Sequence, residues 1–252
     1  MNKVTQTILL SLSLILIQSC ANMNDELLVI GHRGAMGHET ENTLASVQKA
    51  IDLGVDMIEI DVFKIKSGEI VVFHDETVNR LTNATGPIEE YNIHDLRQIV
   101  LEGNHTIPTL QEVLNLIDHK VRLNIELKGA GTTQEVENII QYFIKEKGLA
   151  LDSFLISSFK WDELKEMRKI NNDVPIAILT EHNPLDAIDI AKELNAEAIN
   201  PGFSTLNLEI ANKIHDAGFK IYTWTVNEPA DIYLVKSWSV DGIITNFPER
   251  IK

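Results

Sequence analysis

The sequence has very little cysteine and comparatively few basic residues. Cys20 is its single cysteine, which excludes an internal disulfide in any compartment. Lysine and arginine together number 22 against 37 aspartates and glutamates, and the formal net charge is −15. Nucleic acid is therefore not an expected partner, because a phosphate backbone requires a basic surface. A small anionic substrate would need cations that are concentrated locally at one site.

The sequence also lacks an apolar run long enough to span a bilayer comfortably. Its apolar residues 8–17 follow a short polar start and precede Cys20, which is typical of an export signal. The position of Cys20 resembles that in a bacterial lipoprotein signal, where the cysteine is lipidated and becomes the first residue. An ordinary secretory signal with an incidental cysteine is the alternative. We expect residues 1–19 to be a lipoprotein signal peptide, residues 20–25 a lipidated cysteine and tether, and residues 26–252 one domain.

Short β-rich runs alternate with amphipathic stretches along the whole length. The expected strands lie at residues 28–32, 57–61, 123–127, 154–158, 176–179, 198–200, 221–224 and 242–245. The expected helices include residues 43–53, 134–147, 161–170, 187–194 and 208–217. This alternation is the pattern of a parallel sheet with crossover helices, and the strand count predicts an α/β fold, a closed (β/α)₈ TIM barrel. Because the chain stops soon after Arg250, the eighth outer helix is expected to be very short or absent.

One further apolar run, residues 70–74, does not fit this alternation. It follows the second strand too closely for a crossover, which requires about a dozen residues. Residues 66–69 instead favour a two-residue hairpin loop, whose glycine can take a positive φ. If the ladder has no bulge, this loop places Asp61 opposite His74. We expect an extra β-hairpin arm that carries His74 over the barrel mouth, with an irregular insertion after it.

Charged side chains follow the apolar runs of several expected strands. Glu59 and Asp61 are two residues apart on one strand, so both point to the same face. Carboxylates that close repel each other unless one is protonated or a cation lies between them. Together with Glu126 they form an all-oxygen set that suits Ca²⁺ or Mg²⁺ better than zinc. The alternative is a buried ion-pair network in which Lys128 and Arg33 neutralise the acids.

Two of the eight histidines, His32 and His74, end different expected strands and approach the same barrel mouth. An imidazole has an unperturbed pKa near working pH, which suits general acid and base catalysis. The active sites of such barrels lie at the end where these strands finish. We interpret the remaining histidines as ordinary polar residues.

Short polar motifs recur along the sequence in a defined order. They are Gly31-His-Arg-Gly34, Glu41-Asn-Thr43, Glu59-Ile-Asp61, Val71-Val-Phe-His-Asp75, Ile107-Pro-Thr-Leu110, Glu126-Leu-Lys128, Trp224-Thr-Val-Asn227 and Asp241-Gly-Ile-Ile-Thr245. Each motif is weak alone, but the set is specific. Their order and spacing resemble those of the glycerophosphodiester phosphodiesterase family over nearly all of residues 29–248.

The resemblance implies a catalytic pair, a metal site and a substrate-binding set. These are His32 and His74 as acid and base, Glu59, Asp61 and Glu126 as ligands of one divalent cation, and Arg33, Lys128 and Trp224 as contacts of the substrate. Arg33 and Lys128 would hold the phosphate. Trp224 would form a wall for the glycerol or alcohol group, with barrel packing as the alternative.

Asn42, Thr40 and Asn246 are three further positions near the expected site. Asn42 would polarise the metal shell or cap the following helix, and capping is expected if only one applies. Thr40 stands where the family usually has proline, and Asn246 where an aspartate usually follows Ile-Thr. Neither replaces a predicted metal or catalytic residue. These departures concern the shape of the first loop and the polar support near the last strand.

The sequence thus predicts a metal-dependent phosphodiesterase that hydrolyses glycerophosphodiesters, which are deacylated phospholipids, to sn-glycerol 3-phosphate and an alcohol. The expected nucleophile is water or the substrate's own glycerol 2-hydroxyl. A lipid on Cys20 would anchor the protein to the bacterial cell envelope, at the outer membrane in a cell with two membranes. The alternatives are a related barrel phospholipase acting on intact lipids or phosphoinositides, and a non-catalytic lipoprotein that binds phosphorylated metabolites.

Overall fold

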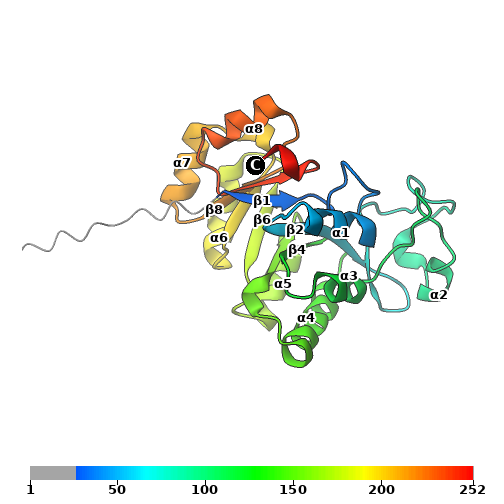
Figure 1. Cartoon of the computed structure of the whole chain (residues 1–252). Coiled ribbons are helices and arrows are strands. Elements are labelled where there is room, and N and C mark those ends of the chain that lie inside the picture. The colour runs from blue at the N-terminus through cyan, green and yellow to red at the C-terminus, as the bar shows by residue number, and fades with distance from the viewer. Residues whose placement is uncertain (1–26, 252) are drawn as a thin grey trace, which may run out of the picture.

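Eight parallel strands close into a barrel in the computed structural model, which describes residues 27–251 (Figure 1). Each strand pairs with the next, and β1 closes the ring by pairing with both β2 and β9. The barrel strands are β1 Leu28–Gly31, β2 Met57–Lys64, β4 Arg122–Leu127, β5 Phe154–Ser158, β6 Ile176–Thr180, β7 Ala198–Pro201, β8 Lys220–Thr223 and β9 Gly242–Thr245. The predicted (β/α)₈ TIM barrel is therefore confirmed.

Helices pack around this barrel and cover the outward faces of its strands. They are α1 Leu44–Asp52, α3 Leu110–Ile117, α4 Thr133–Lys147, α5 Trp161–Ile170, α6 Ile188–Glu193, α7 Leu208–Asp216 and α8 Pro229–Lys236. The short helix α2, Ile93–Leu96, instead lies between β3 and α3, beside the barrel. After β9 the described chain forms only a 3₁₀ turn, Pro248–Arg250, as the short C-terminal segment predicts. None of the helices within residues 27–251 has both the length and the apolar character needed to cross a membrane.

The side chains inside the barrel change from apolar to polar toward its C-terminal mouth. The apolar layer consists of Ile30, Met57, Leu155, Ala177, Ala198, Tyr222 and Ile244. Two residues further along their strands lie the buried polar side chains of Glu59, Ser157 and Asn200, because every second residue of a strand faces the same side. The lower part of the barrel is thus a packed core, and its upper part is lined by polar groups.

The predicted hairpin arm is present, but its register differs from the expected one. β3, Ile70–Val72, runs antiparallel to β2. The expected placement of His74 opposite Asp61 is wrong, since the carbonyl of Asp61 accepts a hydrogen bond from the N–H of Phe73 at 3.0 Å. The loop holds three residues, 66–68, instead of two, and its glycine has φ 103°. One additional loop residue shifts the whole pairing by one position.

The arm belongs to two cores at once. Inside the barrel one face of β2 carries Glu59 and Asp61, and beyond the barrel the same face packs into a second core beneath the insertion, residues 75–108. The second core consists of Phe63, Ile65, Val71, Phe73, Val78, Ile88, Leu96, Ile99, Leu101 and Ile107. Figure 1 shows the insertion with α2 to the right of the barrel. His74 directly follows Phe73, so the second core fixes the backbone at the start of the insertion.

We predict that Phe73→Ala lowers the free energy of unfolding by about 3–5 kcal/mol, because it leaves a cavity in the second core. Phe73 is 1% exposed, whereas Tyr233 on α8 is 79% exposed. Urea unfolding followed by circular dichroism measures both variants. Tyr233→Ala is the control and should change the free energy of unfolding by less than about 0.5 kcal/mol. Equal effects of the two substitutions would contradict the existence of the second core.

Candidate active site

The sequence-predicted site residues within the described part of the chain line one cavity at the barrel mouth, of about 220 Å³. They come from the ends of β1, β2, β4 and β8 and from the residue that follows the arm. They are His32, Arg33, Glu59, Asp61, His74, Glu126, Lys128 and Trp224. The predicted lipidation site, Cys20, and the predicted signal and tether, 1–25, lie outside the described residues.

Three buried carboxylates form the centre of this cavity. Glu59, Asp61 and Glu126 each offer an oxygen within 4.8 Å of the others. Burial, followed by the charges of its two neighbours, raises the pKa of Glu59 well above its usual range, and burial and Asp61 raise the pKa of Glu126 to about 7. Glu59 Oε1 is buried without a hydrogen-bond partner among the described residues. A hard divalent cation would satisfy these oxygens and relieve their repulsion, so the residues fit such an ion.

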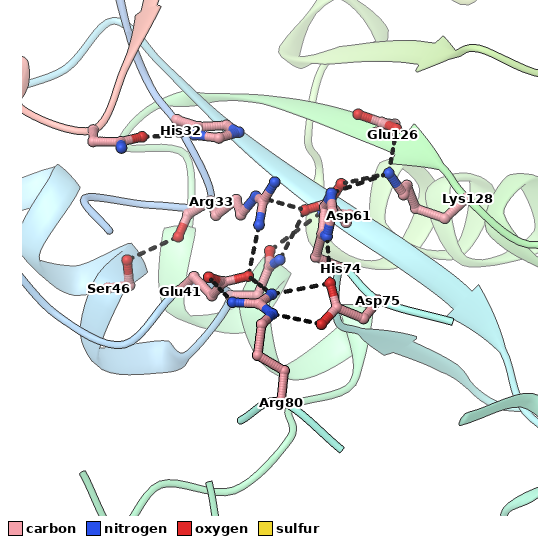
Figure 2. A network of polar contacts seen from close by, with 12 residues as sticks. His32, Arg33, Glu41, Ser46, Asp61, His74, Asp75, Arg80, Glu126 and Lys128 are labelled. Atoms are coloured by element: carbon pink, nitrogen blue, oxygen red, sulfur yellow. Dashed lines mark hydrogen bonds and ion pairs between the residues drawn. The ribbon is translucent and has the colours of Figure 1, made fainter. Parts of the chain in front are cut away.

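Arg33 connects two of these acids to the loop after β1. Its backbone, at φ 50°, directs the N–H to Glu59 Oε2 at 2.9 Å. The guanidinium donates to Glu41 Oε1 at 2.7 Å, and its Nε lies 3.5 Å from Asp61 Oδ2. Ser46 on α1 donates its hydroxyl to the Arg33 carbonyl at 2.8 Å. The loop is therefore held from α1 and from β2 together (Figure 2).

Asn42 positions Asp61, and the expectation that it caps a helix is wrong. Thr43 is the N-cap of α1, where its side chain accepts from the N–H of Ser46. Asn42 instead donates from Nδ2 to Asp61 Oδ2 at 2.8 Å and accepts from the Asp61 N–H at 3.3 Å. These contacts agree with the other role considered for Asn42, a polar contact with the predicted metal shell.

Lys128 faces the acids from the end of β4. Its Nζ lies 3.1 Å from Glu126 Oε1, 3.7 Å from Asp61 Oδ1 and 3.3 Å from His74 Nε2. When all three carboxylates are ionised, Arg33 and Lys128 supply two positive charges against them, which leaves one negative charge. An ion-pair network alone thus does not neutralise the cluster.

The two histidines have different partners. His32 Nδ1 lies 2.7 Å from Asn246 Oδ1, and its Nε2 lies 4.0 Å from Glu59 Oε2. Burial and the charge of Arg33 lower the pKa of His32 to about 4, so the ring is neutral near neutral pH. His74 Nδ1 instead lies 2.7 Å from Asp75 Oδ1. A carboxylate favours the charged form of an imidazole, whereas an amide oxygen does so less strongly.

Arg80, in the insertion, forms a bridge between Asp75, the partner of His74, and Glu41. This bridge was not predicted from the sequence. Arg80 donates to Asp75 Oδ2 at 2.6 Å and, through both terminal nitrogens, to Glu41 at 2.7 and 2.9 Å (Figure 2). The hydrogen bonds from Arg80 lower the pKa of Asp75 to about 2. The bridge thus joins His74 to the loop of Arg33. Thr40 adds a further contact, since its hydroxyl donates to the Glu102 carbonyl of the insertion at 3.0 Å.

An aromatic wall lies on the other side of the cavity. Trp224 donates its indole N–H to the Asn200 carbonyl at 2.8 Å, and Phe159 meets it edge to face with ring centroids 5.4 Å apart. Trp224 therefore packs on the barrel interior, as one of the two alternatives for it expects, and it also lines the cavity; its contact with the substrate stays a prediction. Phe159 and Glu181 also line the cavity and were missed, because they belong to no motif.

We predict that Glu59→Gln raises the melting temperature in excess chelator, because it removes a buried charge that faces two like charges. The folded-state pKa of Glu59 is raised, so the folded protein binds more protons than the unfolded one above about pH 4.5, and stability declines as the pH rises. The advantage of Glu59→Gln should therefore be larger at about pH 8 than at about pH 5. Differential scanning fluorimetry with and without Ca²⁺ measures both effects. A cation-induced rise in melting temperature that survives the substitution would argue against this metal site.

Comparisons with known proteins agree with this site. Residues 32–250 match the glycerophosphoryl diester phosphodiesterase family. The glycerophosphodiester phosphodiesterase of Caldanaerobacter subterraneus is 32% identical over 89% of this chain and 96% of that protein, and the one of Bacillus altitudinis is 31% identical over 88% and 95%.

A solved structure extends the likeness to three dimensions. An Oleispira antarctica phosphodiesterase in complex with its product sn-glycerol-3-phosphate superposes with a TM-score of 0.79 at 26% identity, and the match covers 89% of this chain and 94% of that one. With the family match extending over most of its length, the chain belongs to the glycerophosphoryl diester phosphodiesterase family of enzymes.

Proposed function

We propose that this protein is a metal-dependent hydrolase that converts glycerophosphodiesters to sn-glycerol 3-phosphate and an alcohol. The observation that carries the proposal is the convergence of three buried carboxylates, two cations and two imidazoles on one cavity. The names of the similar enzymes and the product bound to the Oleispira antarctica phosphodiesterase support the same substrate class.

A metal ion held by the acids would bind some of the substrate's phosphate oxygens, and the basic side chains would bind the others. Glu59, Asp61 and Glu126 would hold Ca²⁺ or Mg²⁺, and such an ion supplies charge neutralisation of phosphoryl oxygens and acidifies a bound hydroxyl. Arg33 and Lys128 would bind the remaining phosphate oxygens and supply the positive charge that the acidic chain otherwise lacks. Asn42 would keep Asp61 oriented while the substrate exchanges.

We infer different roles for the two histidines from their different partners. His32 is held by Asn246 at Nδ1, so its neutral Nε2 would take the proton of the nucleophile. His74, whose Nδ1 contacts the Asp75 carboxylate at 2.7 Å, would protonate the departing alcohol oxygen. These roles fit either nucleophile, because water and the glycerol 2-hydroxyl must each lose a proton.

The contacts give less support to the alternative functions. A phospholipase acting on acylated lipids would need an extended apolar rim, and the apolar lining of the described cavity is limited to Phe159, Leu179, Trp224 and Ile244. A protein that only binds phosphorylated metabolites would not need two imidazoles with separate partners.

We also propose that the enzyme is anchored to the cell envelope by a lipid on Cys20, at the outer membrane in a cell with two membranes. The support is the sequence pattern of residues 1–20, in which a short apolar stretch precedes the cysteine. A lipid anchor would keep the cavity close to membranes, the source of deacylated phospholipids.

We predict that His32→Ala and His74→Ala each lower kcat about 10²–10⁴-fold, because a positioned acid or base contributes a factor of this size. Both side chains line the cavity and belong to none of the apolar cores of the described chain, so the melting temperature should change little. Turnover of glycerophosphocholine, glycerophosphoethanolamine, glycerophosphoglycerol and glycerophosphoinositol is measured for wild type and variants.

The same assay with excess chelator provides the metal control. Chelation should abolish wild-type turnover, and added Ca²⁺ or Mg²⁺ should restore it. His94→Ala serves as the matched variant, because His94 lies on α2 outside the cavity and should leave turnover unchanged. Full activity in chelator, or unchanged turnover in His74→Ala, would refute the proposed mechanism.

We predict for the anchor that Cys20→Ser leaves the precursor uncleaved or releases the enzyme from the membrane fraction. A version starting at Asn22 should be soluble and active, because the site is built from residues after β1 begins. Fractionation and metabolic labelling with a fatty acid measure the effect. Equal labelling of wild type and Cys20→Ser would disprove the anchor.

A further inference from the structure

The wall of the cavity that faces Arg33 carries a carboxylate with no role in the proposed mechanism. Glu181 follows β6, and β6 lies four strands from β1 in either direction around the barrel. Glu181 is therefore opposite the loop of Arg33, yet both line the same cavity. A diester whose phosphate is bound at Arg33 can extend one of its two substituents across the mouth to Glu181.

Glu181 is exposed and has no hydrogen bond or ion pair with another residue of the described chain. The backbone around it is fixed, because Thr180 accepts the His182 N–H at 3.3 Å through its hydroxyl and the Gly202 N–H at 3.1 Å through its carbonyl. A carboxylate that is held at a cavity wall without a protein partner is available to a ligand.

Two aromatic rings accompany this carboxylate. Phe159 is 36% exposed and stands at 84° to Trp224 in the same cavity wall. Phe159, Leu179 and Glu181 also line an adjoining hollow that includes Trp161 and His182. Aromatic rings attract cations, and an adjacent carboxylate adds charge attraction. The combination is the one that recognises an ammonium group.

The charges nearby agree with a cationic ligand at this wall. Arg33 follows β1 on the opposite side of the barrel, and Lys128 follows β4, two strands away from β6. Lys160 follows Phe159 in sequence, but it lines a different hollow together with Lys165, one that Glu181 does not line. His182 is the basic side chain of the adjoining hollow. Within the described chain, no lysine or arginine therefore lines the adjoining hollow that Glu181 shares with Phe159.

We propose that Glu181, Phe159 and Trp224 form the subsite of the departing alcohol and select glycerophosphodiesters whose alcohol carries an ammonium group. This inference rests on the proposed hydrolysis and adds headgroup preference to it. Glycerol is uncharged and gains nothing from this combination beyond a hydrogen bond. Polyol headgroups such as glycerol or inositol are therefore the poorer substrates.

The test separates charge from hydrogen bonding. Glu181→Gln keeps an oxygen that accepts hydrogen bonds from hydroxyl groups but loses the charge. Glu193→Gln is the matched control, since Glu193 is exposed at the end of α6 and does not line the cavity. kcat and KM are measured for glycerophosphocholine, glycerophosphoethanolamine, glycerophosphoglycerol and glycerophosphoinositol at saturating metal, with Phe159→Leu as a second variant.

Wild type should prefer the two ammonium substrates over the two polyol substrates in kcat/KM. Glu181→Gln should lower kcat/KM about two- to fivefold for the ammonium substrates, mainly through KM, as expected for loss of a partly exposed ion pair. It should leave the polyol substrates unchanged. Phe159→Leu should cost the ammonium substrates a similar factor of about two to five. Glu193→Gln should change none of the four.

Two results would overturn the inference while leaving the proposed function intact. One is equal or faster wild-type turnover of the polyol substrates. The other is a uniform loss on all four substrates in Glu181→Gln, which would place the shared glycerol half at this wall. The absence of turnover on all four substrates would overturn the proposed function itself, and this inference with it.

Discussion

The mutual repulsion of Glu59, Asp61 and Glu126 is the constraint that organises the barrel mouth. The fold places these acids on adjacent strands, in a region too buried for water to screen them. Their neighbours compensate in part: Arg33 and Lys128 supply positive charge, and backbone or amide donors reach Glu59 Oε2 and Asp61 Oδ2. The compensation is incomplete, and the incomplete part is where a cation fits. The fit for a divalent cation thus follows from placing more acid than base at one end of a closed sheet.

The features repeated along the strands could be predicted from the sequence. The barrel follows from the alternation of apolar runs with amphipathic stretches, and the metal cluster follows from the spacing of Glu59 and Asp61, because strand periodicity alone places them on one face. The strand-end positions of His32 and Lys128 likewise follow from where the apolar runs stop. These inferences use only neighbours in the chain, which is why they hold without knowledge of loop conformation.

The remaining contacts depend on how distant loops meet. Arg80 and Glu41 are separated by 39 residues in the sequence, and His32 and Asn246 by 214. No local sequence pattern therefore indicates either contact. The hairpin register was misjudged by one residue, because sequence does not distinguish a two-residue loop from a three-residue loop that uses the same glycine. Asn42 was assigned to the wrong partner for a related reason: Thr43 satisfies the helix end and leaves the amide free to turn toward Asp61.

The division of β2 between two cores has a consequence for the way in which the protein loses its structure. The second core is paired to the rest of the sheet through β2 and β3, so it cannot persist once β2 leaves the barrel. Loss of β2 from the barrel should therefore also unfold the insertion, which gives the two parts one cooperative unfolding step. The hydrogen bonds of Arg80 with Glu41 and of Thr40 with Glu102 also link the insertion to the loop after β1, so we expect the segment at His74 to be a fixed wall past which substrates enter.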